Sequence, residues 1–138
     1  MNVVTENVCY NFCMKLSIPE DCGNAPRKEF IRDFNIAFGE NDTEKILSFM
    51  SDDIVWDMIG YKKVAGKEAV RKELESNGLG VATELLLSRI ITHGDTAAAN
   101  GVMKFAKTTM AFCDVYEFTG HNKNAKIKEL TSYGIEQK

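Results

Sequence analysis

The segment 109-TMAFCDVYEF-118 has the alternating pattern of a β-strand and lies among similar segments. The other strand candidates of this part of the chain are 83-TELLLSRIIT-92, 97-AAANGVMKFA-106 and 125-AKIKELTSYGI-135. Turn signals separate them at 93-HGD-95, near Lys107-Thr108 and at 120-GHNKN-124. The second half of the chain therefore predicts a four-stranded antiparallel meander.

One face of the strand 109–118 collects four apolar side chains and one carboxylate, because successive side chains alternate between faces. These residues are Met110, Phe112, Asp114, Tyr116 and Phe118. A buried carboxylate is costly unless it is neutralised or paired. Asp114 is therefore expected to line a functional cavity or, alternatively, to bond a structural partner such as Arg89 or Asn100.

The first half of the chain carries helical patterns. In 27-RKEFIRDFNIAFGEND-42, apolar residues recur at helical spacing between Pro26 and Gly39. Asp42 is a candidate N-cap for a second helix over 43–50. A strand is expected at 54-IVWDMI-59, followed by a third helix over 67–76. This order predicts an α+β domain in which a curved sheet wraps over the first helix, since each element has one apolar face to bury.

Residues 1–26 look like an extension of the domain formed by residues 27–138. Val8, Phe12 and Leu16 would share one face of a short helix, and Cys9 and Cys13 would lie one turn apart. A partly ordered tail is the alternative for this segment.

Composition and charge exclude several classes of function. The chain has 138 residues, a size typical of one domain, and a formal net charge of −3, which argues against nucleic-acid and anionic membrane surfaces. It lacks an apolar run long enough to span a bilayer and a basic region typical of a secretory signal. The four cysteines and two histidines show no metal-ligand spacing. We expect reduced thiols, a cytoplasmic location, and neither a metal nor another cofactor.

The order of elements, with 51-SDDIVWDMIG-60 after two helices and G-K-E-A-V-R at 66–71, resembles the nuclear transport factor 2-like superfamily. The SnoaL-like and ketosteroid-isomerase-like branch is the most similar. The resemblance covers residues 27–136 and implies a cone-like, curved, mixed or antiparallel sheet around three N-terminal helices. It also implies a cavity at the open end of the cone and a homodimer.

The isomerase branch implies catalytic roles for two aspartates. Asp57 stands in the context of its general base, and Asp114, followed by Tyr116, stands where the branch has a protonated acid that donates a hydrogen bond. The alternative for Asp57 is a capping role or a pair with Lys62 or Lys63. Phe34 occupies the position of the branch's tyrosine donor and has no hydroxyl.

Other side chains are expected to line the pocket beside the two aspartates. The predicted lining is Phe30, Phe34, Trp56, Arg89, Asn100, Met103, Phe105, Phe112 and Tyr116. Arg89 would be a positive counterpart of Asp114 or, alternatively, a surface side chain at a sheet edge. The aromatic residues would be pocket walls or plain core.

Two functions from different classes remain open at this point. The first is a small, largely apolar molecule bound in the pocket, with isomerase, cyclase or hydrolase chemistry by Asp57 and Asp114. The second is a non-catalytic ligand-binding or dimeric interaction module. Fold resemblance does not choose between them.

Overall fold

The computed structural model describes residues 3–9, 13–19 and 26–137. Its helices are α1 (Pro26–Gly39), α2 (Thr43–Ser48) and α3 (Lys67–Ser76). Its strands are β1 (Val3–Cys9), β2 (Cys13–Pro19), β3 (Met50–Met58), β4 (Lys62–Ala65), β5 (Glu84–His93), β6 (Thr96–Lys104), β7 (Thr109–Phe118) and β8 (Ile127–Gln137). The strands form one sheet in the order β1-β2-β5-β6-β7-β8-β3-β4.

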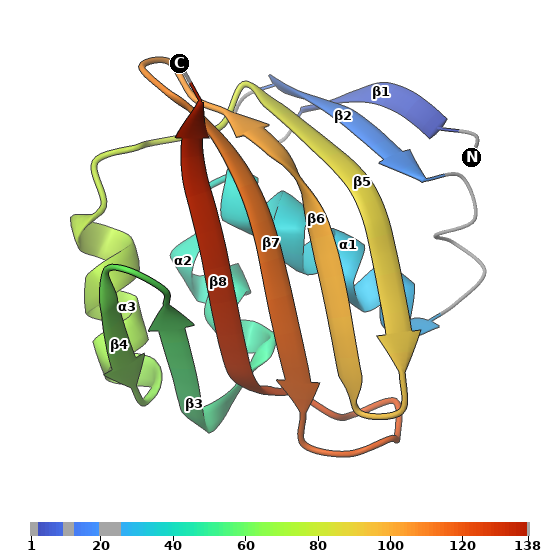
Figure 1. Cartoon of the computed structure of the whole chain (residues 1–138), viewed down its shortest axis with the longest axis vertical. Helices are drawn as coiled ribbons and strands as arrows, with labels where there is room; N and C mark the ends of the chain where they lie inside the picture. Colours follow the sequence, from blue (N-terminus) through green and yellow to red (C-terminus); the bar gives the residue numbers. More distant parts are fainter. Residues whose placement is uncertain (1–2, 10–12, 20–25, 138) are drawn as a thin grey trace.

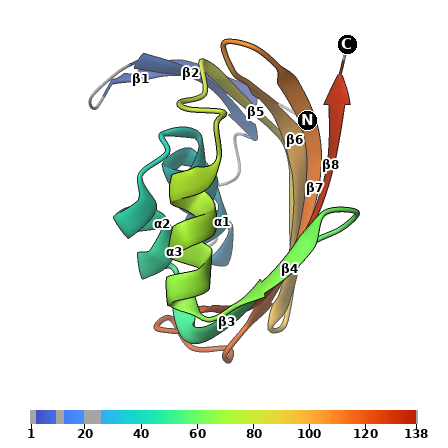
Figure 2. The same cartoon turned by 90° about the vertical axis from the view of Figure 1, so that its left-hand side faces the viewer.

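The sheet is mixed and strongly curved. Strand β2 runs parallel to β5 and β3 runs parallel to β8, whereas the other neighbours are antiparallel. Figure 1 shows the meander β5–β8 in front of α1 and α2, and Figure 2 shows the sheet bending around all three helices. The predicted α+β class and the sheet wrapped around three helices are confirmed.

The helices form where the sequence signals predicted them. In α1, Ile31, Phe34 and Ala37 are buried toward the sheet. The Asp42 side chain caps α2 by accepting a hydrogen bond from the backbone N–H of Lys45 at 3.2 Å. Among the described residues, no helix is both long and apolar enough to cross a lipid bilayer.

A register shift in β5 lets the sheet bend around α1. The pairing of β5 with β6 is regular except between Leu87 and Arg89, where one extra residue is accommodated. The carbonyl of Leu86 approaches Gly101 in β6 so closely that a Cβ at this glycine would lie 1.9 Å from the Leu86 oxygen. The absence of a side chain at Gly101 is therefore a condition of this curvature.

The N-terminal segment differs from its predicted helix or tail. Strands β1 and β2 pair as an antiparallel ribbon in which Cys9 is the register partner of Cys13. Met14, Leu16 and Ile18 of β2 are buried in the main core. Alternation of period two across Met14, Leu16 and Ile18 is the physical reason for a strand, and β5 offers this segment an edge to pair with. Strand β4, which the sequence reading did not identify, extends the opposite edge of the sheet.

Candidate functional site

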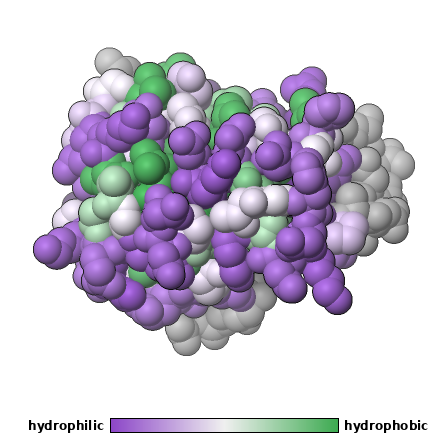
Figure 3. Space-filling view, turned by 90° about the horizontal axis from the view of Figure 1, so that it is seen from below, coloured by the Kyte–Doolittle hydropathy of each residue, from purple (hydrophilic) through white to green (hydrophobic). Residues whose placement is uncertain are grey.

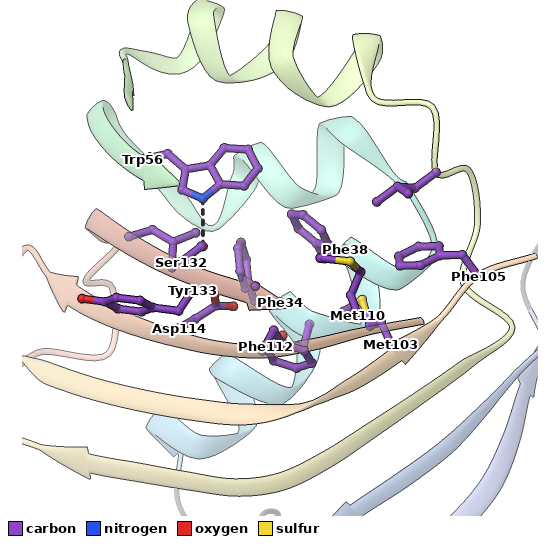
Figure 4. Close-up of a pocket in the computed structure, with 14 residues that line it drawn as sticks. Phe34, Phe38, Trp56, Met103, Phe105, Met110, Phe112, Asp114, Ser132 and Tyr133 are labelled. Atoms are coloured by element: carbon purple, nitrogen blue, oxygen red, sulfur yellow. Dashed lines mark hydrogen bonds between the residues drawn. The ribbon is translucent and has the colours of Figure 1, made fainter. Parts of the chain in front are cut away.

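A cavity of about 140 Å³ lies between α1 and the inner face of the sheet. It is lined by Phe34, Asn35, Phe38, Trp56, Leu79, Met103, Phe105, Met110, Phe112, Asp114, Leu130, Ser132, Tyr133 and Gly134. Leu79, from the segment between α3 and β5, is partly exposed at its rim, whereas alternation along β8 directs the Tyr133 side chain to the outer face of the sheet. Figure 4 shows the lining side chains from α1, β3 and the meander gathered around the cavity, with the Tyr133 ring directed away from the others. Most of this surface is apolar, so water inside the cavity finds few hydrogen-bond partners.

Asp114 is the carboxylate in this apolar lining. Strand β7 places it on the inner face, opposite Ser132 of β8 and Ala99 of β6. Burial raises the pKa of Asp114 from 3.8 to about 7, while hydrogen bonds with the side chains of Ser132 and Tyr116 act in the opposite direction. Desolvation is the larger effect, so a substantial share of Asp114 is neutral at physiological pH.

The hydrogen bonds of Asn35 determine that the Tyr116 hydroxyl donates to Asp114. The Nδ2 group of Asn35 donates to the carbonyl of Ile31 at 2.9 Å and to the Tyr116 hydroxyl at 3.0 Å. An amide nitrogen has two protons, and both are used here, so the Tyr116 hydroxyl accepts from Asn35. Its own proton is then available to Asp114. Burial and the Asp114 charge raise the pKa of Tyr116 well above 10.0, which keeps that proton on the tyrosine.

Ser132, like Tyr116, donates its hydroxyl proton toward Asp114. The indole Nε1 of Trp56, which can only donate, bonds the Ser132 hydroxyl oxygen at 2.9 Å, as the dashed line in Figure 4 shows. The Ser132 proton is then free to point to Asp114. Both hydroxyls thus donate to the carboxyl group, and the neutral acid has its own proton left to donate into the cavity.

Several predicted pocket residues do lie together. Phe34, Trp56, Met103, Phe105 and Phe112 line the cavity with Asp114. Tyr116 is fully buried beside it, with its ring 5.9 Å from the Phe34 ring in an edge-to-face arrangement. The hydroxyl that Phe34 lacks is thus supplied to Asp114 by Tyr116 and Ser132.

Four other predicted residues are not brought into this cavity. Asp57 follows Trp56 directly, so it faces the outer side of the sheet, where its register partners are Lys63 and Thr131. Phe30 lies one turn nearer the N-terminus of α1 than Phe34, and its ring packs against the rings of Phe49 and Phe118.

Arg89 and Asn100 also lie on the outer face, as register partners of each other. The bulge after Leu87 reverses the alternation of β5, so that Ile90 is buried while Arg89 and Ile91 are exposed. In β6, Asn100 and Met103 are an odd number of residues apart and cannot share a face of a regular strand. Arg89 is therefore not a positive partner of Asp114.

Two residues of the hydrogen-bond network were missed by the sequence reading. Asn35 lies four residues after Ile31, on the buried face of an amphipathic helix, and a polar residue at this position predicts a buried hydrogen bond. Ser132 shares the inner face of β8 with Leu130, but only the pairing register places it opposite Asp114. That register depends on the whole sheet and cannot be obtained from one strand.

Comparisons with known proteins agree with this architecture. One similar structure is an NTF-2 like protein of unknown function from Burkholderia xenovorans LB400, with 16% sequence identity and a TM-score of 0.67 over 83% of this chain and 85% of that chain. A putative ketosteroid isomerase from Kribbella flavida DSM 17836 shares 11% identity, with a TM-score of 0.66 over 86% of this chain and 82% of that chain.

A third similar structure is an LEH-like epoxide hydrolase from M. tuberculosis, with 17% identity and a TM-score of 0.62 over 78% of this chain and 80% of that chain. At these identities, the three structures show the shared fold alone. A comparison with curated protein sequences gives no match.

Sequence comparison gives a family as well as a fold. The profile of the SnoaL-like domain matches residues 31–129, a range that includes most of α1, the strands β3 to β7 and all cavity residues except those of β8. The resemblance to the nuclear transport factor 2-like superfamily is thereby confirmed. This chain belongs to the SnoaL-like domain family.

Proposed function

We propose that the cavity binds a small, largely apolar molecule and that Asp114 donates a hydrogen bond to an acceptor atom of that molecule. The observation that carries the proposal is the neutral-acid environment of Asp114, which is the acidic residue of an otherwise apolar lining. Tyr116 and Ser132 orient the carboxyl group, and apolar walls make a donated hydrogen bond stronger than in water.

The volume of the cavity limits the ligand. An apolar cavity of about 150 Å³ holds one benzene molecule, and this cavity has a volume of about 140 Å³. A single ring with one carbonyl or ether oxygen therefore fits as a whole. A larger molecule is expected to place one ring inside and the rest beside Leu79 at the rim.

The proposed chemistry follows from the same group. A carboxylic acid that donates to a ligand oxygen would also stabilise negative charge developing there during isomerisation, cyclisation or hydration. Among the described residues that line the cavity, Asp114 is the sole carboxylate, and histidine and lysine are missing. These lining residues offer no ready general base, so they support ligand binding more directly than a complete acid–base reaction.

Binding of cyclohexanone, a six-membered ring with one acceptor, tests the proposal by ligand-detected NMR. We expect wild-type affinity to fall as pH rises through about 7, because the ionised acid cannot donate. Asp114→Asn retains a donor and should bind with little pH dependence, whereas Asp114→Ala should bind about three- to tenfold more weakly. Affinity that is unchanged in Asp114→Ala, or that rises with pH, would contradict the proposal.

Two variants make this test specific. Glu75→Gln changes an exposed carboxylate of α3 and is the matched control for loss of charge. Asp57→Asn separates the proposal from a two-carboxylate mechanism. If only Asp114 contacts the ligand, Asp57→Asn should bind cyclohexanone as the wild type does. If both aspartates contact the ligand, substitutions at Asp57 and at Asp114 should both change the affinity.

The second candidate function is a dimeric interaction module that uses the outer face of the meander. Its support is the exposure of Ile91 and Ile135, which are 60% and 71% exposed. Neutral side chains lie between them on β6 and β7, including Ala98 and Val115, so the centre of this face is apolar and Arg89 lies toward its β5 edge. Because we expect the cysteines to be reduced thiols, we propose a cytoplasmic location under both candidate functions.

Light scattering at micromolar concentration tests the dimer. We expect a mass of two chains for the wild type and of one chain for Ile91→Asp, since a buried unpaired carboxylate is costly. Val81→Asp, which changes an exposed apolar residue before β5, is the control and should keep the wild-type mass. A wild-type mass of one chain would refute the proposed dimer.

A further inference from the structure

A second cavity, of about 350 Å³, lies at the opposite end of β7 from the first and shares none of its lining residues. It is formed by the first turn of α1 and the loop between β7 and β8. Its lining residues are Pro26, Arg27, Phe30, His121, Asn122, Lys123 and Ala125. Figure 3 views the end of the molecule that carries this loop, and hydrophilic residues predominate there.

The chemistry of this lining is cationic on one side and apolar on the other. Arg27 and Lys123 carry positive charge, His121 and Asn122 offer hydrogen-bond donors, and Phe30 supplies an aromatic surface. None of the described residues that line the cavity is acidic. A neutral apolar molecule would leave these donors without acceptors, whereas an anion would pair with them.

Arg27 is held in place, and the described residues give it no ion pair. Its Nη2 donates to the backbone carbonyl of Gly120 at 3.1 Å, and its guanidinium carbon lies 3.9 Å from the centre of the Phe118 ring. Its Nη1 is shielded from water and has no hydrogen-bond partner among the described residues. Burial lowers the pKa of Arg27, and the charge of Asp95 offsets this only in part.

This arrangement has an electrostatic consequence. A fixed, partly desolvated cation that no described carboxylate pairs with raises the positive potential of the cavity beside it. An anion in the cavity would supply the missing counter-charge through space, and it would contact Lys123, His121 and Asn122 directly. The rigid placement of Arg27 by Gly120 and Phe118 means that little side-chain entropy is lost on binding.

We propose that this second cavity binds a small organic anion, with its carboxylate or phosphate group toward Arg27, His121 and Lys123 and a flat apolar part against Phe30. The site is separate from the cavity that contains Asp114, and it does not depend on the function proposed there. Its size allows a ring together with its anionic group.

The probes for this site are phenyl phosphate, benzoate and inorganic phosphate, each titrated into the ¹⁵N-labelled chain. We expect phenyl phosphate to give saturable shifts at Arg27, His121 and Asn122, and the other two probes to separate the contributions of the ring and of the anionic group. Binding should weaken as salt rises from about 0.02 M to about 0.5 M, because screening reduces the attraction. Cyclohexanone should leave these signals unchanged.

Variants of the exposed loop avoid disturbing the contacts that Arg27 makes with the fold. The double variant His121→Gln/Lys123→Gln should bind phenyl phosphate about three- to tenfold more weakly than the wild type. Lys72→Gln, an exposed lysine of α3, is the charge-matched control and should bind as the wild type does. Absence of saturable shifts, or equal affinity in the double variant and the wild type, would overturn the proposal.

Discussion

The free energy of unfolding is expected to depend on pH between about pH 4 and pH 8 because the Asp114 carboxyl group titrates there. Asp114→Asn is expected to remove this contribution. In the folded chain the pKa of Asp114 is about 7, whereas an unfolded aspartate titrates near 3.9. Between these values the folded state binds more protons than the unfolded state. The stabilising contribution is therefore complete below the unfolded pKa and is lost as pH rises through about 7.

The size of this effect follows from the shift. Each pKa unit corresponds to about 1.4 kcal/mol, and partial exposure of the residue reduces the full value, so we expect a loss of roughly 2 to 4 kcal/mol. Urea unfolding of wild type, Asp114→Asn and Glu75→Gln at several pH values measures it. The difference between the wild type and Asp114→Asn should change with pH, and the difference between the wild type and Glu75→Gln should change much less. Parallel pH profiles for all three proteins would contradict this account of Asp114.

Gly101→Ala is expected to destabilise the fold more than any other single methyl addition considered in the meander. The added Cβ would lie 1.9 Å from the Leu86 carbonyl oxygen and 3.1 Å from the Leu87 Cα. These are backbone atoms, so no side-chain rotation relieves the overlap, and strands β5 and β6 must separate. We expect a loss of about 3 kcal/mol or more, at the upper end of the range for overpacked sites.

Thermal unfolding of Gly101→Ala and Gly78→Ala provides a matched comparison. Gly78 lies in the segment after α3, where a Cβ would meet nothing within 4 Å. Its replacement should change stability by no more than about 0.5 kcal/mol. If the two variants unfold at the same temperature, the close approach of β5 to β6 at Gly101 is not a feature of the folded protein in solution.

The sequence predicts some helices and strands of the fold but not others. The apolar spacing of Phe30, Phe34 and Phe38, with Gly39 at the end, predicted α1 because local periodicity determines an amphipathic helix. The four meander strands were also predicted, since alternation and turn residues are local signals. The hairpin β1–β2 was not, because its apolar residues also fit a helical face and the pairing of β2 with β5 is remote in sequence.

The candidate site was harder to predict for a physical reason. Asp114 was identified because a carboxylate is conspicuous on an apolar strand face. Arg89 was assigned to the wrong face because a single-residue bulge reverses every later side chain of β5, and no local signal marked that bulge. Ser132 and Tyr116 both donate hydrogen bonds to Asp114, and only the folded sheet brings the three side chains together.

The central claim is that Asp114 is a neutral acid that donates its proton to a ligand in the cavity. Titration of the Asp114 carboxyl carbon by ¹³C NMR, with and without saturating cyclohexanone, tests this claim most directly. We predict a midpoint of about 7 in the free protein and a higher midpoint in the complex, because a ligand that binds the protonated form raises its pKa. A midpoint near 3.8 that cyclohexanone does not change would contradict the claim.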